Sequence, residues 1–458
     1  MMPYSLIKRD PELGYLDNWL WLPKGKVNAD IIKRGLTVPV MIDGELDSMK
    51  LWRDAPNHIG IPRARLNPDE LDYEVVDLRP KSFPKADFSR NNIVMDQQRP
   101  ERTEQQDAFD DFTCSENGIL NMACGKGKTV ICLHAIAKWG ENTLVICNTK
   151  QLMRQWHQEA TDPKLFNMDP EDIGKVQGKP ETWDWKKPLV IASLKTLAMY
   201  CDQVPVEMLL WFGRIIWDEV HHLSALQFSK TAPICPGHRY GASATTTRAD
   251  GMEFVYYWHV GKEVHTNLEQ DIIPTVLFKK SRTAIDLSHK DVCDKNGQVH
   301  HRKLAAYVGQ LERELDFAED LVSNALEKGR DIVAISLSKD HAQALHERVP
   351  NSGVLHAGVK DEDERLRMLD EHKITFGTVD MLAEALNKKT LDSLIILTEF
   401  KSPKNAQQST GRIQRLLLDR EKRAKVIVIF HVNIPPMRRM GMKLMQYFKR
   451  CGFKVKVK

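Results

Sequence analysis

Short apolar runs alternate with amphipathic segments over most of the chain that follows residue 98. The first series of apolar runs covers residues 118–122, 143–147, 189–193 and 214–217. The segments between these runs have the apolar spacing that is typical of helices. Buried runs of this length separated by helices indicate βα units and a parallel sheet covered on both faces. The first of these helices is predicted to stop at Gly140, because glycine suits the position just past a helix end.

A second series of apolar runs begins near residue 272 and includes 331–337, 373–379, 394–398 and 425–430. Two such series in tandem predict an α/β protein with two similarly built lobes. The first 95 residues differ, because they are rich in Pro, Asp and Arg and contain only short β-like runs. We therefore expect a small N-terminal α+β domain at 1–95, a first lobe at 96–270 and a second lobe at 271–458.

The composition is that of a soluble globular protein, with 42% hydrophobic and 28% charged residues. The formal net charge of +4 is small for 458 residues, so charge alone does not identify a polyanionic partner. Eight cysteines are scattered without a C-x-x-C pair, which fits free thiols in a reducing cytosol. No apolar run is typical of a signal peptide or a membrane span, so we expect a cytoplasmic protein.

The stretch 122–129, MACGKGKT, ends like a phosphate-binding loop. The usual pattern is G-x-x-x-x-G-K-[ST], and Met122 stands where its first glycine should be. Gly125 and Gly127 allow backbone N–H groups to turn inward, Lys128 can reach the outer phosphates, and the Thr129 hydroxyl can bind Mg²⁺. The alternative is a glycine turn with incidental lysines. The predicted strand, loop and helix around the stretch favour phosphate binding, since a helix N-terminus attracts anions.

Two further groups of residues are suited to ATP hydrolysis. Asp218 and Glu219 follow the apolar run 214–217, at the sheet edge where open α/β folds bind ligands. Asp218 could hold Mg²⁺ while Glu219 polarises a water molecule, unless the pair is only a solvated strand end. The second group, Gln408, Arg412 and Arg415, shares one face of a predicted helix and could stabilise charge on transferring phosphates. A basic helix surface is the alternative there.

The order of these elements resembles that of superfamily-two helicases and translocases, from about residue 98 to 430. Residues 105–108 resemble the element before the first lobe, 122–129 motif I, 149–156 motif Ia and 218–221 a DEVH variant of the DExx box. Residues 243–245, 331–338, 378–387 and 408–415 are similar to motifs III, IV, V and VI. The resemblance implies two RecA-like lobes with ATP and Mg²⁺ held between them, and variation at the first loop position is tolerated in this family.

The resemblance also implies roles for individual residues. ATP and Mg²⁺ are expected at Gln105, Cys124, Gly125, Lys126, Gly127, Lys128, Thr129, Asp218 and Gln408, with Thr129 and Asp218 as metal ligands. Catalysis is expected from Lys128, Asp218, Glu219, Arg412 and Arg415, and coupling from His221, Ser243, Ala244, Thr245 and Glu384. Backbone contacts with nucleic acid are expected from Thr149, Gln155 and Thr378, for which helix capping and packing are the alternative.

The run 243–251, SATTTRADG, is similar to one in the XPB/Rad25 group, which resembles the UvsW-type phage helicases that remodel branched DNA. The run 58–63, HIGIPR, resembles part of the small domain before such motors, and Arg63 is expected to contact nucleic acid. A phage-encoded DNA helicase in the host cytoplasm, monomeric and acting on forked or branched DNA, is therefore the leading hypothesis. The alternatives are an RNA helicase, a restriction-type translocase, and an ATP-gated clamp that does not unwind.

Some residues depart from the family pattern. Thr246 replaces a proline, and Thr103 and Glu104 replace a Pro-Tyr pair near the expected adenine site. In motif V, Ala385 and Asn387 replace a glycine and an aspartate, and this change keeps the clamp hypothesis open.

The last part of the chain is basic. Residues 437–458 contain eight Lys or Arg residues and no acid, so we expect a tail that binds phosphates, beginning with Arg438 and Arg439. Two His/Cys clusters, at 221–238 and 289–301, lack the paired spacing of a structural zinc site. Structural zinc is therefore not favoured.

Overall fold

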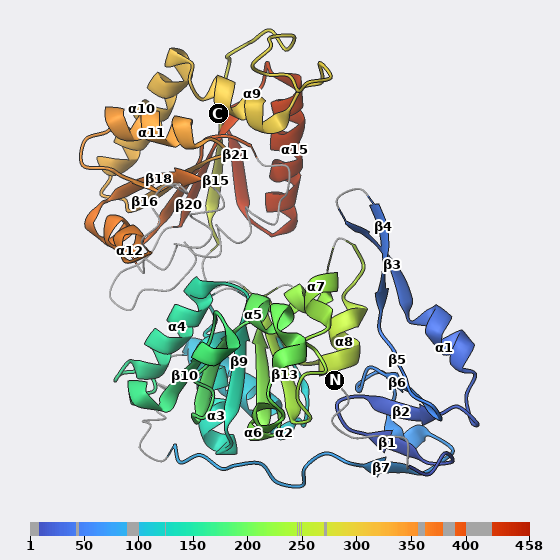
Figure 1. Ribbon diagram of the computed structural model, residues 1–458. Helices are drawn as coiled ribbons and strands as arrows, with labels where there is room; N and C mark the ends of the chain where they lie inside the picture. Colours follow the sequence, from blue (N-terminus) through green and yellow to red (C-terminus); the bar gives the residue numbers. More distant parts are fainter. Residues whose placement is uncertain are drawn as a thin grey trace. The chain divides into compact units, whose positions relative to one another are not determined.

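The computed structural model describes residues 9–42, 45–88, 100–123, 125–244, 246, 248, 250–269, 273–355, 362–378, 390–399 and 424–458. The chain forms two compact units, Met1–Glu269 and Gln270–Lys458, and each is described by itself (Figure 1).

The core of the first unit is a seven-stranded parallel sheet in the order β10-β11-β9-β12-β13-β8-β14. Its strands are β8 (Gly118–Met122), β9 (Thr143–Cys147), β10 (Ile173–Val176), β11 (Leu189–Ser193), β12 (Arg214–Asp218), β13 (His238–Ser243) and β14 (Glu263–Asn267). Alternate residues of β9 enter two different hydrophobic clusters, with Leu144 in one and Val145 in the other. Both faces of the sheet are therefore covered, as the apolar runs predict.

Helices from the segments between the strands cover both faces of this sheet. One face packs against α2 (Pro100–Cys114), α3 (Lys128–Trp139) and α4 (Lys150–Thr161). The other face packs against α5 (Leu194–Met199), α6 (Val206–Trp211), α7 (Leu226–Ser229) and α8 (Phe254–Val260). The predicted end of α3 is confirmed, because Gly140 caps the helix in the left-handed conformation at φ 60°.

The second unit contains a seven-stranded parallel sheet with the same topology, in the order β17-β18-β16-β19-β20-β15-β21. Numbered by their order along each unit, the strands of both sheets follow 3-4-2-5-6-1-7. The strands are β15 (Thr275–Ser281), β16 (Ile332–Ser336), β17 (Gly353–Leu355), β18 (Ile374–Thr378), β19 (Ser393–Ile396), β20 (Lys425–His431) and β21 (Lys454–Val457). The prediction of two similarly built RecA-like lobes is thus confirmed.

The helices of the second unit also lie on both sides of its sheet. Helices α10 (Glu312–Leu326) and α11 (Lys339–Arg348) pack on one face, and α12 (Glu362–Glu371) and α15 (Pro435–Arg450) on the other. Helix α9 (His301–Val308) packs against the start of α15 through Leu304 and Met437.

The N-terminal residues form a small mixed sheet in the order β5-β6-β2-β1-β7. Its strands are β1 (Gly14–Leu16), β2 (Leu20–Pro23), β5 (Arg53–Asp54), β6 (His58–Ile61) and β7 (Val75–Asp77), accompanied by helix α1 (Ala29–Gly35). Strands β3 (Thr37–Ile42) and β4 (Glu45–Lys50) form a separate two-stranded hairpin. Leu20 and Ile59 share a hydrophobic cluster with Val255 of α8, so this sheet packs against the first RecA-like core.

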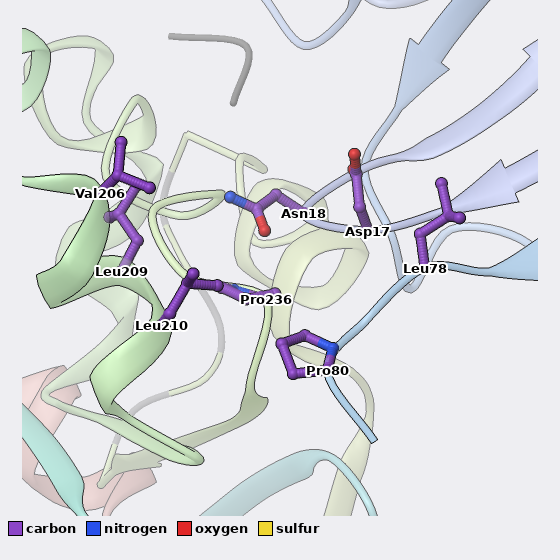
Figure 2. Close-up of a pocket in the computed structure, with 8 residues that line it drawn as sticks. All are labelled: Asp17, Asn18, Leu78, Pro80, Val206, Leu209, Leu210 and Pro236. Atoms are coloured by element: carbon purple, nitrogen blue, oxygen red, sulfur yellow. The ribbon is translucent and has the colours of Figure 1, made fainter. Parts of the chain in front are cut away.

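Two buried arginines fasten the N-terminal sheet to that core. Arg63 donates to the carbonyl oxygens of Pro236 (2.7 Å) and Gly237 (2.9 Å), and Arg239 donates to that of Asn18 (2.9 Å). The expectation that Arg63 contacts nucleic acid is therefore corrected, because its side chain is buried and its donors bind protein carbonyls. A small pocket at the same junction is lined mainly by apolar side chains, among them Leu78 and Leu209 (Figure 2).

The basic C-terminal stretch is part of the second RecA-like unit and not an appended tail. Helix α15 buries Leu444 and Phe448 against the sheet and Met437 against α9, and β21 pairs with β15 at the sheet edge. Arg438 and Arg439 are exposed on α15. Deleting residues 437–458 would therefore remove core packing together with the basic charges.

Candidate active site

The phosphate-binding loop lies between β8 and α3, as predicted. Met122 ends β8 with its side chain fully buried, so the position of the missing glycine belongs to the strand core. Gly125 and Gly127 both have positive φ angles, of 88° and 80°. The φ angle of Gly127 favours glycine, and a Cβ atom there would also lie 2.4 Å from Nε2 of Gln105, whose side chain would have to move.

Hydrogen bonds and an ion pair hold this loop against α2. Gln105 Nε2 donates to the carbonyl oxygen of Lys126 at 2.9 Å. Lys126 Nζ lies 2.9 Å from Glu104 Oε2, and Asn267 Nδ2 donates to the same oxygen at 2.7 Å. The hydrogen bond from Lys126 holds the pKa of Glu104 below its usual value. Glu104, which departs from the family pattern, thus orders the loop.

Lys128 is the first residue of α3, where the helix N-terminus favours anions. Its ammonium group donates to the carbonyl oxygens of Met122 (2.9 Å) and Ala123 (3.2 Å) inside the loop. Its positive charge lowers the pKa of both Asp218 and Glu219, which shows that the loop and the DExx box lie close together.

The two carboxylates occupy the C-terminal edge of the sheet. Asp218 ends β12, and its Oδ2 accepts a hydrogen bond of 2.9 Å from Nε1 of the buried Trp156. Burial raises the pKa of Asp218, and the neighbouring Glu219 raises it further. Burial also raises the pKa of Glu219, but the hydrogen bond and charge of His221 outweigh it, so the net shift is downward. The lowered pKa keeps Glu219 ionised, and its side chain is accessible enough to accept a hydrogen bond from a water molecule.

His221 and Ser243 connect Glu219 to the next strand. His221 Nδ1 lies 3.3 Å from Glu219 Oε2 and 3.0 Å from Ser243 Oγ, and Ser243 donates to the same Glu219 oxygen at 3.3 Å. Ser243 ends β13, so this triangle joins the ends of two neighbouring strands. Arg248 donates to the His221 carbonyl at 2.6 Å and extends the network beyond β13.

The residues fit a nucleoside triphosphate with Mg²⁺. The loop offers a glycine turn, a helix N-terminus and one ammonium group, which are the donors that phosphate oxygens need. The Thr129 hydroxyl and the Asp218 carboxylate are the oxygen ligands that Mg²⁺ prefers. Bound there, Mg²⁺ would neutralise phosphate charge, while Lys128 holds the outer phosphates and Glu219 orients the attacking water.

Two of the expected nucleic-acid contacts lie at element ends, and Gln155 lies within α4. Thr149 caps α4, and its hydroxyl oxygen accepts a hydrogen bond of 3.2 Å from the Leu152 amide. Gln155 donates to Glu159 at 2.7 Å, and Thr378 ends β18. Thr246, which replaces a proline, is buried and accepts a hydrogen bond of 3.0 Å from Asn121. These contacts neither require nor prevent binding of a phosphate backbone.

Several predicted residues lie outside the described residues, namely Cys124, Thr245, Glu384, Gln408, Arg412 and Arg415. Within the part of the chain that is described, no three His, Cys, Asp or Glu side chains converge as metal ligands. No helix of that part is long and apolar enough to cross a membrane.

Sequence reasoning gave no role to three features of the structure. Glu104 directly precedes Gln105, and Trp156 ends motif Ia. Only the folded loop and sheet show that Glu104 pairs with Lys126 and that Trp156 donates a hydrogen bond to Asp218. The third feature is a buried ion cluster of Glu314, His431 and Glu399 in the second unit, whose members are far apart in the chain.

Comparison with known proteins supports the same class. Residues 98–247 match the family model "Type III restriction enzyme, res subunit". A protein of Acanthamoeba polyphaga mimivirus named as an ATP-dependent RNA helicase is 25% identical over 349 residues, which are 74% of this chain and 64% of that protein. A helicase of Escherichia phage T5 is 24% identical over 78% of this chain and 76% of its own length.

Two further matches are of different kinds: the first is a similarity in sequence and the second a similarity in fold. A Halobacterium salinarum protein named as the DNA 3'-5' helicase Rad25 is 32% identical over 166 residues, 36% of this chain and 27% of its own length. The structure of Saccharomyces cerevisiae Dbp5 bound to RNA and ADP BeF3 has a TM-score of 0.54 at 13% identity, covering 79% of this chain and 93% of Dbp5. This last match shows the fold alone.

The matched segment and the helicase relatives support the predicted class, because the chain is similar to ATP-dependent hydrolases of the superfamily-two helicase type. Within that class, the chain is similar to the XPB/Rad25 proteins and to viral and phage helicases.

Proposed function

We propose that the protein is an ATP-dependent DNA helicase or translocase that unwinds or remodels branched DNA, such as replication forks or recombination intermediates. The Rad25 relative is named as a DNA helicase and supports DNA as the polymer, and the phage T5 relative supports a helicase. The proposal places a phage-encoded protein in the host cytoplasm and treats it as a monomer.

In the proposed cycle, Lys128 binds the outer phosphates of ATP and Glu219 takes a proton from the attacking water. Loss of the γ-phosphate changes the charge beside Glu219, and the change passes through His221 to Ser243 at the end of β13. The proposal further assigns phosphate-binding roles to Gln408, Arg412 and Arg415, and nucleic-acid contacts to Thr149, Gln155, Thr378, Arg438 and Arg439.

The observation that carries the proposal is the hydrogen-bonded triangle of Glu219, His221 and Ser243. A simple phosphatase needs only the water-activating carboxylate. A connection from that carboxylate to a neighbouring strand is what a motor needs, because ATP hydrolysis must be transmitted to the polymer-binding surface.

An RNA helicase is the second candidate, because the mimivirus relative is named as one. The residues expected to contact nucleic acid do not distinguish DNA from RNA, since contacts with the phosphate backbone carry no sequence information. The match to the type III restriction enzyme family likewise keeps a restriction-type translocase as a candidate.

Polymer-stimulated ATP hydrolysis tests the proposal. Hydrolysis is measured with no polymer, single-stranded DNA, forked DNA and structured RNA, and strand displacement is then measured on the best activator. We expect forked DNA to stimulate most and to be unwound or remodelled. Stronger stimulation by RNA would favour the RNA helicase, and stimulation without displacement would favour a translocase or a clamp.

A further inference from the structure

Three neighbouring strands of the second unit carry lysines on the same side of the sheet. Strand β15 lies between β20 and β21, with Thr275 opposite both Lys425 and Lys454, and Leu277 opposite Lys456. Directly paired residues of parallel strands point to the same side, and alternate residues share a face. We call the set Lys279, Lys425, Lys454, Lys456 and Lys458 the lysine face.

Helices leave this face open at the sheet edge. Val276 and Phe278 of β15 point to the other side, where they pack against α15. The cluster beneath α10 and α11 contains Ile427 and Ile429 of β20, but no residue of β15 or β21. Lys454, Lys456 and Lys458 are accordingly exposed, and Lys279 and Lys425 are half-buried.

The positive charges of the lysine face lie close enough to affect one another's pKa values. Burial lowers the pKa of Lys425, and the charges of Arg330, Lys328, Lys279 and Lys458 lower it further. Among the described residues, no acidic side chain forms an ion pair with any member of the lysine face. Arg330 lies at the border of the face, 3.6 Å from Asp392. The cation that is paired with an acid is therefore at the edge of the face and is not one of its five lysines.

We propose that the lysine face binds the sugar-phosphate backbone of double-stranded nucleic acid, as a second contact surface separate from the nucleotide-binding loop. The proposal rests on the proposed function only for the choice of nucleic acid as the polyanion. Ammonium groups act as point charges that bind phosphates without reading bases, so the contact is independent of sequence.

The dimensions of the face suit an extended polyanion. Four residues of β21 span about 13 Å, and two strand spacings from β20 to β21 span about 10 Å. A duplex carries one charge per about 1.7 Å, so about eight phosphate charges fall within 13 Å of its length. These separations are comparable to the Debye length of about 8 Å at physiological salt, so neighbouring lysines act on the same stretch of backbone.

The side chains around the lysines favour a duplex over a single strand. Sequence-independent binding of single strands relies on aromatic side chains that stack with unpaired bases. Between the lysines this face presents Thr275 and Leu277, neither of which is aromatic. Of these two side chains only Leu277 is apolar, and it is half-buried, which disfavours insertion into a membrane surface.

The test uses the full-length chain with Lys454→Gln, Lys456→Gln and Lys458→Gln combined. These side chains are exposed on an edge strand, so the fold is retained, which thermal unfolding checks. The control combines Lys164→Gln, Lys175→Gln and Lys179→Gln, three exposed lysines of the first unit with the same total charge. Binding of a labelled blunt duplex and of a single strand is measured by fluorescence anisotropy over a range of NaCl concentrations.

We expect the β21 triple variant to bind the duplex about 10- to 100-fold more weakly. We also expect its slope of log K against log salt to fall by about 0.9 for each lost phosphate contact. The control variant and a Lys→Arg triple at the β21 positions should keep the parent slope. An unchanged duplex slope in the Gln variant would overturn the proposal. An equal loss of single-strand affinity would overturn the duplex assignment, and loss of binding only to anionic lipid vesicles would assign the face to membranes instead.

The same variants separate this inference from the proposed function. If duplex binding depends on the β21 lysines but no polymer stimulates ATP hydrolysis, the lysine face stands and the proposed motor fails. If forked DNA stimulates hydrolysis while the variant keeps the parent duplex slope, the motor stands and the lysine face is wrong.

Discussion

The two RecA-like sheets have the same strand order, yet the residues at the ends of corresponding strands differ in chemistry. In the first unit, a glycine loop with Lys128 follows the first strand, Glu219 follows the fifth, and Ser243 ends the sixth. In the second unit, Ser281 ends the first strand, Glu399 lies beyond the fifth, and His431 ends the sixth. The same edge therefore carries a polar cluster in both units.

Burial decides what each cluster can do. His431 Nδ1 lies 2.9 Å from Glu399 Oε2, its Nε2 lies 3.2 Å from Glu314 Oε2, and Ser281 donates to Glu314. The three ionisable side chains are at most 3% exposed, whereas the Glu219 side chain is 26% exposed. The second cluster is satisfied internally, while the first keeps an accessible carboxylate for a ligand. Sheet topology fixes where polar residues gather, and solvent access separates an active site from a structural ion cluster.

The largest effect on activity is expected at Lys128, the cation of the glycine loop in the first unit. Lys128→Ala removes the cation nearest the outer phosphates, and ATP hydrolysis should fall by about 10³-fold or more, as for other cations that stabilise phosphoryl transfer. Steady-state phosphate release measures the effect. Lys138→Ala, at the exposed end of the same helix, is the control and should hydrolyse ATP at the parent rate.

Matched glutamate variants test the comparison directly. Glu219→Gln removes the water-activating carboxylate, so hydrolysis should fall by about 10²–10⁴-fold while ATP binding and stability persist. Glu399→Gln leaves the buried His431 with one carboxylate fewer and should lower the free energy of unfolding by about 1–3 kcal/mol. Hydrolysis rates, nucleotide binding and urea unfolding are measured for both. A Glu219→Gln protein that hydrolyses ATP at the parent rate would remove Glu219 from the mechanism.

The part of the first unit that carries the candidate site could be predicted from the sequence, because its signals are local. The apolar runs predict β8, β9, β11 and β12 but not β10, β13 or β14, and the glycines around Lys128 predict the turn that leads into α3. Asp218 and Glu219 follow an apolar run directly, so their place at the sheet edge follows from strand geometry.

The errors and omissions concern contacts between distant segments. Arg63 is a surface arginine by sequence alone, and only packing against residues 236 and 237 shows that its charge is buried. The basic residues after Met437 predict a tail, but they lie on α15 and β21, whose apolar residues make both elements part of the second unit's fold. Glu314, Glu399 and His431 have no sequence spacing that could have predicted their ion cluster.

The buried cluster predicts a pH dependence for the second unit. Burial lowers the pKa of His431, but Glu399 and Glu314 outweigh it and raise the pKa to about 10. The stabilisation is therefore complete below the unfolded value of 6.5 and is lost as the pH rises through about 10. On the acidic side, burial and the charge of His431 lower the pKa of His341 to about 4, so stability also falls as the pH drops below 6.5.

His431→Gln tests this dependence. The variant leaves two buried carboxylates without their cation and should lose about 3–5 kcal/mol near pH 6.5. The difference from the parent should shrink as the pH rises toward and through 10, because the folded parent then loses the proton on His431. All ten tryptophans precede residue 259, so a transition seen by circular dichroism but not by tryptophan fluorescence reports the second unit. A difference that stays constant from pH 6.5 to 10 would contradict the assigned charge of His431.

The smallest effect is expected at Ser243, the counterpart of His431 at the end of the sixth strand. Ser243→Ala removes one hydrogen bond to Glu219 and one partner of His221 but no charge, so unfolding should change by only about 1 kcal/mol. Hydrolysis without polymer should stay within a few-fold of the parent rate, because Lys128, Asp218 and Glu219 remain. Stimulation by forked DNA should fall more than this basal rate, since the connection from Glu219 to β13 is broken. Equal losses in basal and stimulated rates would show that Ser243 only positions Glu219, and the edge of the first sheet would then be a hydrolytic site without a built-in link to the polymer.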